Sequence, residues 1–195
     1  RAFTMLAITV VCSGLIYQIT AYALPKVFEE RLFDFAGQSM LGIGGFVSIC
    51  YLFSSLTQII GGELADRLPR KLVYAAFQFL QVPIYGLAFA TFGPLLIPLA
   101  ALMISLNLMA QPAENSLLAR YTPLGWRGKG FGVKFLLTLG VSSLGLALVP
   151  LIHAATGSLD GLFILLGLSA FISFTAAAAL PSERAVLQVE AETGQ

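Results

Sequence analysis

Charge is scarce in this sequence. Only 11% of its 195 residues are Asp, Glu, Lys or Arg, whereas soluble domains carry roughly 25%. A chain with so few charges cannot cover a globular surface with hydrated groups, which excludes the ordinary soluble domain. Hydrophobic residues make up 57% of the sequence instead, and this indicates a protein that resides in a lipid bilayer.

Metal-ligating residues are scarce as well. The chain has two cysteines and one histidine, and Cys12 and Cys50 each lie in an apolar run without a ligand neighbour at a useful spacing. We therefore expect both to pack as small hydrophobic residues, and we predict no metal site and no cofactor. Basic residues are also few and gather on one side of the predicted topology, so nucleic acid is not an expected partner. The chain opens on Arg1 rather than Met, so we expect a fragment or a processed product.

Long apolar runs are what the sequence has in abundance. Six runs are long enough to cross about 30 Å of hydrocarbon at about 1.5 Å per residue. They cover residues 3–24, 39–60, 72–91, 95–118, 131–153 and 159–180, and we expect Pro25 to end the first. None alternates with a period of two, and backbone groups in lipid must be satisfied within their own segment. We therefore predict an all-α integral membrane fold with six transmembrane helices in residues 1–181, followed by a polar cytoplasmic tail, 182–195.

The lysines and arginines predict the orientation of these spans. With six spans, one side of the membrane receives all of the eleven basic residues except Lys26 and Arg31. Cytoplasmic loops carry such an excess of Lys and Arg. Both termini are therefore expected in the cytoplasm, and we expect the membrane to be a bacterial cytoplasmic membrane.

A charged stretch, GGELADRLPRKL at residues 61–72, separates the second and third runs on the cytoplasmic side. Its spacing resembles the signature of the major facilitator superfamily, which in that family lies between the second and third helices of a six-helix half. One departure is Leu68-Pro69, which stands where the family usually has a second glycine, and we expect Pro69 to stiffen the turn. The residues that carry the resemblance are Gly62, Leu64, Ala65, Asp66, Arg67, Arg70 and Lys71.

The chemistry of this motif fits a latch at the inner gate of a transporter. Gly62 is expected to let its helix approach a neighbour closely, and Asp66 to face the donors or the N-terminus of another helix. Arg67, Arg70 and Lys71 can reach carbonyl ends, acidic partners or lipid phosphates. The alternative is a basic loop that only sets the topology.

A second stretch, ENSLLARYTPLGWRGKGFG at residues 114–132, is similar to the family's junction between its fourth and fifth helices. The resemblance implies one half of a twelve-helix transporter, built from inverted three-helix repeats. The fourth run lacks an arginine and the tail is short, which favours the C-terminal half. The expected partners are the lipid bilayer, the missing six-helix half of the same protein and a small-molecule substrate.

The resemblance also implies that the first and fourth helices face a central cavity, with parts of the second and fifth. Polar residues recur at helical spacing in three of these runs, and polar side chains are costly in hydrocarbon. We expect them to line the cavity, with hydrogen bonding between helices as the alternative. These residues are Thr9, Ser13, Tyr17 and Gln18 in the first run, Asn107 and Gln111 in the fourth, and Thr138 in the fifth.

Glu114 is the one acidic residue that can lie within a span. It can serve as a proton-coupling carboxylate, or it can form an ion pair with Lys134 or Arg127 at the inner ends of the fourth and fifth spans. We favour the ion pair, in which Glu114 belongs with Asp66 to the inner gate.

The function that the resemblance implies is secondary active transport of a small solute by alternating access, as a symporter or antiporter coupled to a proton or a sodium ion. A membrane scaffold or channel is an alternative, but no filter-forming loop motif is present. An intramembrane protease is a further alternative. GVSSLG is a poor match to G-x-S-x-G, His153 falls in the same span, and H-E-x-x-H is absent, so we do not expect an enzyme.

Overall fold

The computed structural model describes residues 2–32, 35 and 39–181, so the expected tail lies outside the described residues. Six of its helices are long and apolar enough to cross a membrane, which confirms the predicted all-α fold. No strand occurs among the described residues. The elements are α1 (Ala2–Leu32), α2 (Gly42–Arg67), α3 (Arg70–Ala90), α4 (Leu96–Tyr121), the 3-10 helix η2 (Leu124–Trp126), α5 (Arg127–Thr156) and α6 (Asp160–Ala178).

The first two helices are longer than the apolar runs that predicted them. Pro25 was expected to end the first span, but it lies inside α1, which continues to Leu32. A proline removes one backbone hydrogen bond and kinks a helix, and in a membrane bundle the neighbouring helices can hold the continuation in place. α2 likewise continues through the charged motif as far as Arg67, since nothing in GGELADR breaks a helix before Pro69.

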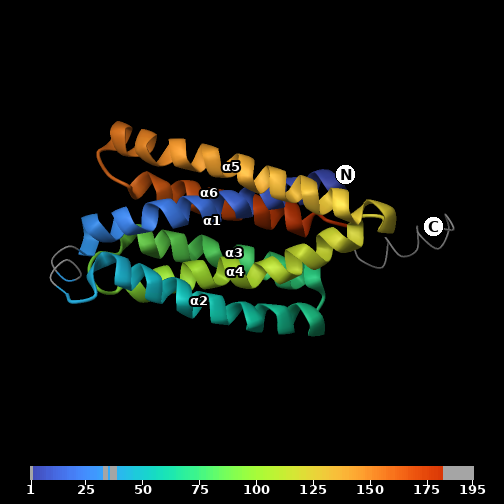
Figure 1. Ribbon diagram of the computed structural model, residues 1–195, viewed down its shortest axis with the longest axis horizontal. Coiled ribbons are helices and arrows are strands. Elements are labelled where there is room, and N and C mark those ends of the chain that lie inside the picture. Colours follow the sequence, from blue (N-terminus) through green and yellow to red (C-terminus); the bar gives the residue numbers. More distant parts are fainter. Residues whose placement is uncertain (1, 33–34, 36–38, 182–195) are drawn as a thin grey trace.

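The helices pack in pairs that repeat after a shift of three. α2 packs mainly on α4 and α5 mainly on α1, while α3 packs on α4 and α6 packs on α1; α3 also packs on α6, and α1 on α4. Exchanging the first three helices with the last three converts this set of pairs into itself. Two inverted three-helix repeats produce this pattern. Figure 1 shows α2 and α5 along opposite edges of the bundle, with α1, α3 and α4 between them.

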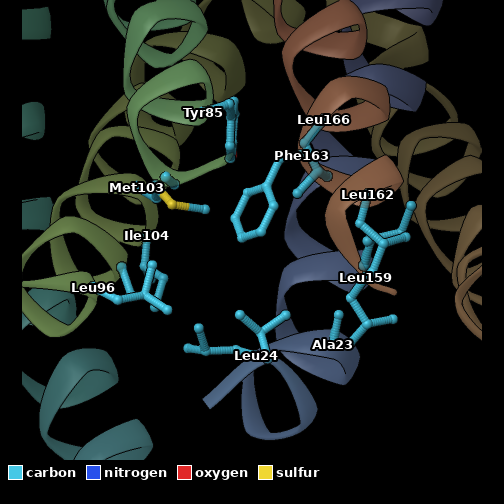
Figure 2. Packing of buried hydrophobic residues seen from close by; sticks show 14 of the residues in the cluster. Ala23, Leu24, Tyr85, Leu96, Met103, Ile104, Leu159, Leu162, Phe163 and Leu166 are labelled. Carbon is cyan, nitrogen blue, oxygen red and sulfur yellow. The ribbon is translucent and has the colours of Figure 1, made fainter. Parts of the chain in front are cut away.

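The two ends of the bundle can be named by their connections. The motif end holds the α2–α3 and α4–α5 connections, and the far end holds the α1–α2, α3–α4 and α5–α6 connections (Figure 1). One apolar cluster lies toward the far end, where Phe163 of α6 points between Tyr85 of α3, Met103 of α4 and Leu24 of α1 (Figure 2). A second cluster, around Leu117 of α4, lies toward the motif end. Such close packing is what associates helices in lipid.

Arg31 closes the far end of the bundle. Its side chain is only 4% exposed and forms an ion pair with Asp160 at the start of α6. It also donates hydrogen bonds to the carbonyls of Ala88 and Thr91, at 2.6 and 3.0 Å. These carbonyls belong to the end of α3, where a helix leaves its last acceptors without partners. Arg31 therefore ties α1 to both α3 and α6.

Candidate functional site

The charged motif spans the end of α2, a short turn and the start of α3. Leu68 is extended, and Pro69 precedes α3 with φ −57°. The carbonyl of Pro69 accepts hydrogen bonds from the N–H groups of Leu72 and Val73, at 2.9 and 3.1 Å. Because proline fixes its own φ, the turn between α2 and α3 is short and stiff.

The charged side chains of the motif have different partners. Asp66 is exposed. Arg67 forms an ion pair with Glu63 at 2.5 Å, and both side chains are exposed. Lys71 donates a hydrogen bond to the carbonyl of Leu180, just beyond α6. Exposed ion pairs add little to stability, whereas the bond of Lys71 ties the motif to the end of the last helix.

Close helix approach is made by Gly61 and not by Gly62. A Cβ atom on Gly61 would overlap the backbone of Met109 in α4, whereas one on Gly62 would meet nothing within 4 Å. The expectation for Gly62 is therefore corrected. Successive helical residues point about 100° apart, and only the first glycine of the pair faces α4. Arg70 is half-buried as the first residue of α3.

A polar cavity with a volume of about 630 Å³ lies between α1, α2, α4 and α5. α3 and α6 contribute no lining residue. The hydroxyl and amide groups of the lining can donate and accept hydrogen bonds, which suits a polar solute. Of the residues predicted to line a cavity, those that do so are Ser13, Tyr17, Gln18, Gln111 and Thr138, and α2 adds Tyr51, Ser55 and Gln58.

Glu114 of α4 lies in the wall of this cavity and is 2% exposed. Its Oε1 atom is 2.7 Å from Nζ of Lys134 in α5. Its Oε2 atom accepts hydrogen bonds from Oγ of Ser13 in α1, at 2.6 Å, and from the hydroxyl of Tyr74 in α3, at 2.9 Å. Three donors from three other helices thus satisfy the carboxylate, as a buried charge requires.

Lys134, and not Arg127, is the cationic partner of Glu114. Nζ of Lys134 also donates a hydrogen bond to Oδ1 of Asn115, at 2.5 Å. Arg127 lies about two helical turns earlier in α5, and its Nε atom donates to the carbonyl of Ala119 at 3.1 Å. Of the two partners proposed for Glu114, Arg127 is therefore corrected to a cap on the end of α4.

Two residues expected in the cavity wall are buried between helices instead. Thr9 is 0% exposed, and its Oγ1 atom donates to the carbonyl of Leu6 at 2.8 Å within α1. Asn107 is also buried and does not line the cavity. The expectation is corrected for both. α1 and α4 are each surrounded by several helices, so only part of a polar stripe can face the cavity.

Three members of the polar cluster were not predicted from the sequence: Tyr74, Asn115 and Ser173. The hydroxyl of Tyr74 lies 3.1 Å from Oγ of Ser173, which brings α6 into contact with the group around Glu114. A signal was present in the third span, where polar residues recur at helical spacing on one buried face of α3. That face carries Tyr74, Gln78, Gln81 and Tyr85.

No metal site is formed by the described residues, since no three His, Cys, Asp or Glu side chains gather there. Both cysteines are free: Cys12 is half-buried and Cys50 is buried. Sγ of Cys50 lies 3.6 Å from the carbonyl of Ile97, as a small residue packed between α2 and α4.

The chain matches a known protein family. The family model described as Major Facilitator Superfamily matches residues 6–195. The chain belongs to the major facilitator superfamily. No curated protein and no solved structure gave a match. Members of the major facilitator superfamily are membrane transporters, so the general function of this integral membrane protein is to carry a small solute across a lipid bilayer.

Proposed function

We propose that this chain is one six-helix half, the C-terminal one, of a secondary transporter that works by alternating access. The observation that carries the proposal is the Glu114–Lys134 ion pair in the wall of a polar cavity. Charges within the hydrocarbon region are expensive, and membrane proteins keep them mainly where a substrate or an ion passes. The pair therefore marks the solute pathway.

The low burial of α2 and α5 supports the proposal of a missing half. In the most apolar stretches of α2 and α5, only 11% and 12% of the residues are buried, against 44–56% in the other four long helices. α2 packs on α4 and α5 packs on α1, and all four helices line the cavity. A second six-helix unit placed against α1, α2, α4 and α5 would enclose the cavity and give the solute a closed pathway.

The ion pair can act as a contact that forms and breaks during the cycle. α5 packs mainly on α1 and only slightly on α4, to which Arg127 and Lys134 also bond at Ala119 and Asn115. Beside the cavity, the link between α5 and α4 is the ion pair of Lys134 with Glu114. A solute that competes for Lys134 or Glu114 would release that link and allow α5 to move relative to α4. The coupling ion is proposed to be a proton or a sodium ion, and the membrane a bacterial cytoplasmic membrane with the motif end inside.

The motif is proposed to latch the inner gate. Asp66 is exposed at the motif end, where it is available to a partner on the missing half. We expect Asp66→Asn to shift the protein between its inward- and outward-facing states while changing the free energy of unfolding by less than about 0.5 kcal/mol. Unchanged cavity accessibility in this variant, measured as below, would remove the motif from the gate.

Alternating access can be tested without knowing the solute. In the complete protein freed of other cysteines, including Cys12→Ala and Cys50→Ala, Gln111→Cys is treated with a membrane-impermeant thiol reagent from either side of sealed vesicles. Labelling from both sides is expected because the cavity opens in turn to each. Thr9→Cys is the matched control: it belongs to the same kind of polar stripe but is buried, and should stay unlabelled. Labelling of Gln111→Cys from one side alone would contradict alternating access.

A further inference from the structure

The connection between α4 and α5 borders a groove that takes no part in the cavity. The groove has a volume of about 550 Å³ and shares no lining residue with the cavity. Its lining is apolar except at the rim, where Nζ of Lys129 lies 4.3 Å from the ring centroid of Trp126. The lining residues are Phe3, Thr122, Pro123, Trp126, Lys129, Gly130 and Val133.

One polar atom in this groove lacks a partner. Thr122 is 5% exposed, and its Oγ1 atom is buried without a hydrogen-bond partner among the described residues. A buried hydroxyl that makes no hydrogen bond is destabilising. The atom has almost no accessible surface, so a ligand in the groove can bond to it only after the Thr122 side chain turns to another rotamer.

The groove lies in positively charged surroundings. The sequence has no acidic residue between Glu114 and Asp160. Arg127 and Lys129 are both exposed beside the groove. Arg127 uses its Nε atom to cap α4, which leaves the rest of its guanidinium available for an anion. The charge of this surface is therefore complementary to a negatively charged group.

The same segment carries exposed apolar side chains at the end of the membrane-spanning helices. Leu124 and Trp126 in η2 are both exposed. Tryptophan concentrates at the level of lipid headgroups, where its ring is in contact with lipid and its N–H with water. We therefore expect η2 and the groove beside it to lie at the depth where headgroups and the first acyl carbons meet.

We propose that this groove binds an anionic phospholipid. One acyl chain lies along Phe3 and Val133, and the phosphate is held by Lys129, with the hydroxyl of Thr122 joining once its side chain turns toward the groove. Basic residues at the cytoplasmic ends of transmembrane helices bind anionic headgroups in this way. The site is independent of the solute pathway, and it would hold whichever solute the protein carries.

The proposal can be tested through Trp126, the single tryptophan of the chain. The complete protein is reconstituted with phosphatidylglycerol or phosphatidylcholine carrying brominated acyl chains, which quench tryptophan fluorescence on contact. Subtracting the signal of Trp126→Phe isolates Trp126 from tryptophans elsewhere in the protein. We expect phosphatidylglycerol to reach half-maximal quenching at a lower mole fraction than phosphatidylcholine. Lys129→Gln should weaken the preference about fivefold, the fold-change that corresponds to about 1 kcal/mol for one basic residue near an anionic lipid.

The controls separate the competing explanations. Lys26→Gln removes an exposed lysine toward the far end and should leave the preference unchanged. Thr122→Val keeps the shape of the side chain, removes the hydroxyl and should weaken the preference less than Lys129→Gln does. Soluble glycerol phosphate should not compete. Equal quenching of Trp126 by the two lipids would overturn the proposal, and so would competition by glycerol phosphate. Absence of quenching by either lipid would also overturn it, because another part of the protein would then cover the groove.

Discussion

Two buried charges join the helices of this bundle, and their bonding partners differ in kind. At the far end, Arg31 bonds to two backbone carbonyls and to Asp160, and its guanidinium lies over the rings of Phe92 and Phe163 at 4.5 and 4.8 Å. In the cavity wall, Glu114 bonds only to side chains, and each comes from a different helix.

The difference shows which charge is suited to change partners. The backbone carbonyls at the end of α3 do not move without moving the helix, and the Arg31 side chain is buried against them, so Arg31 is suited to one arrangement. Among the partners of Glu114, Ser13 and Lys134 line a cavity that a solute can enter and can turn by changing rotamer, whereas Tyr74 is fully buried. We therefore regard the Arg31 cluster as a fixed joint of the fold and the Glu114 cluster as the part that rearranges during transport.

The largest effect is expected from Lys134→Met. It leaves Glu114 charged and buried without its cation, a change that costs about 3–5 kcal/mol in free energy of unfolding. Two-sided labelling of Gln111→Cys should be lost at the same time. Thermal unfolding in detergent measures the first effect and the vesicle assay the second. A variant as stable as the parent would show that the ion pair contributes nothing to the fold.

Arg31→Leu is expected to have the next largest effect, and to separate the two regions. It removes three charge-assisted hydrogen bonds, but Asp160 is 41% exposed and can be hydrated, so we expect a loss of about 2–3 kcal/mol. The labelling pattern of Gln111→Cys in the folded protein should stay two-sided, because the cavity does not include Arg31. Conversion to one-sided labelling would mean that the far end also rearranges. The distinction between a fixed Arg31 cluster and a rearranging Glu114 cluster would then be wrong.

The smallest effects concern the two glycines near the motif. Gly61→Ala forces a methyl group against the backbone of Met109 and should cost about 1–3 kcal/mol. Gly62→Ala is its matched control, because it meets open space and should raise stability by up to about 1 kcal/mol through helix propensity. Chemical unfolding of both variants measures the difference. Equal losses would show that α2 and α4 do not meet at Gly61.

The fold was predictable from the sequence to the extent that it depends on single segments. Apolar length specified six helices. The rotation of each helix relative to its neighbours depends on packing, which one-helix patterns do not contain. For that reason Thr9 and Asn107 were assigned to the cavity, Gly62 was chosen over Gly61, and Tyr74 was not recognised as a partner of Glu114. The contact between Glu114 and Lys134 could be anticipated because both lie at the same end of consecutive spans and carry opposite charges.

The most direct test of the central claim is the double variant Glu114→Gln, Lys134→Met, with two-sided labelling of Gln111→Cys as the measurement. Removing both charges leaves no buried ion uncompensated, so the double variant should regain at least half of the stability that Lys134→Met loses. A well-folded protein is then available that lacks the exchangeable ion pair and the bond from Lys134 to Asn115. We expect Gln111→Cys in this protein to be labelled from one side alone. Labelling from both sides at the parent's rate would contradict it, and the Glu114–Lys134 pair would then be a joint of the fold like Arg31.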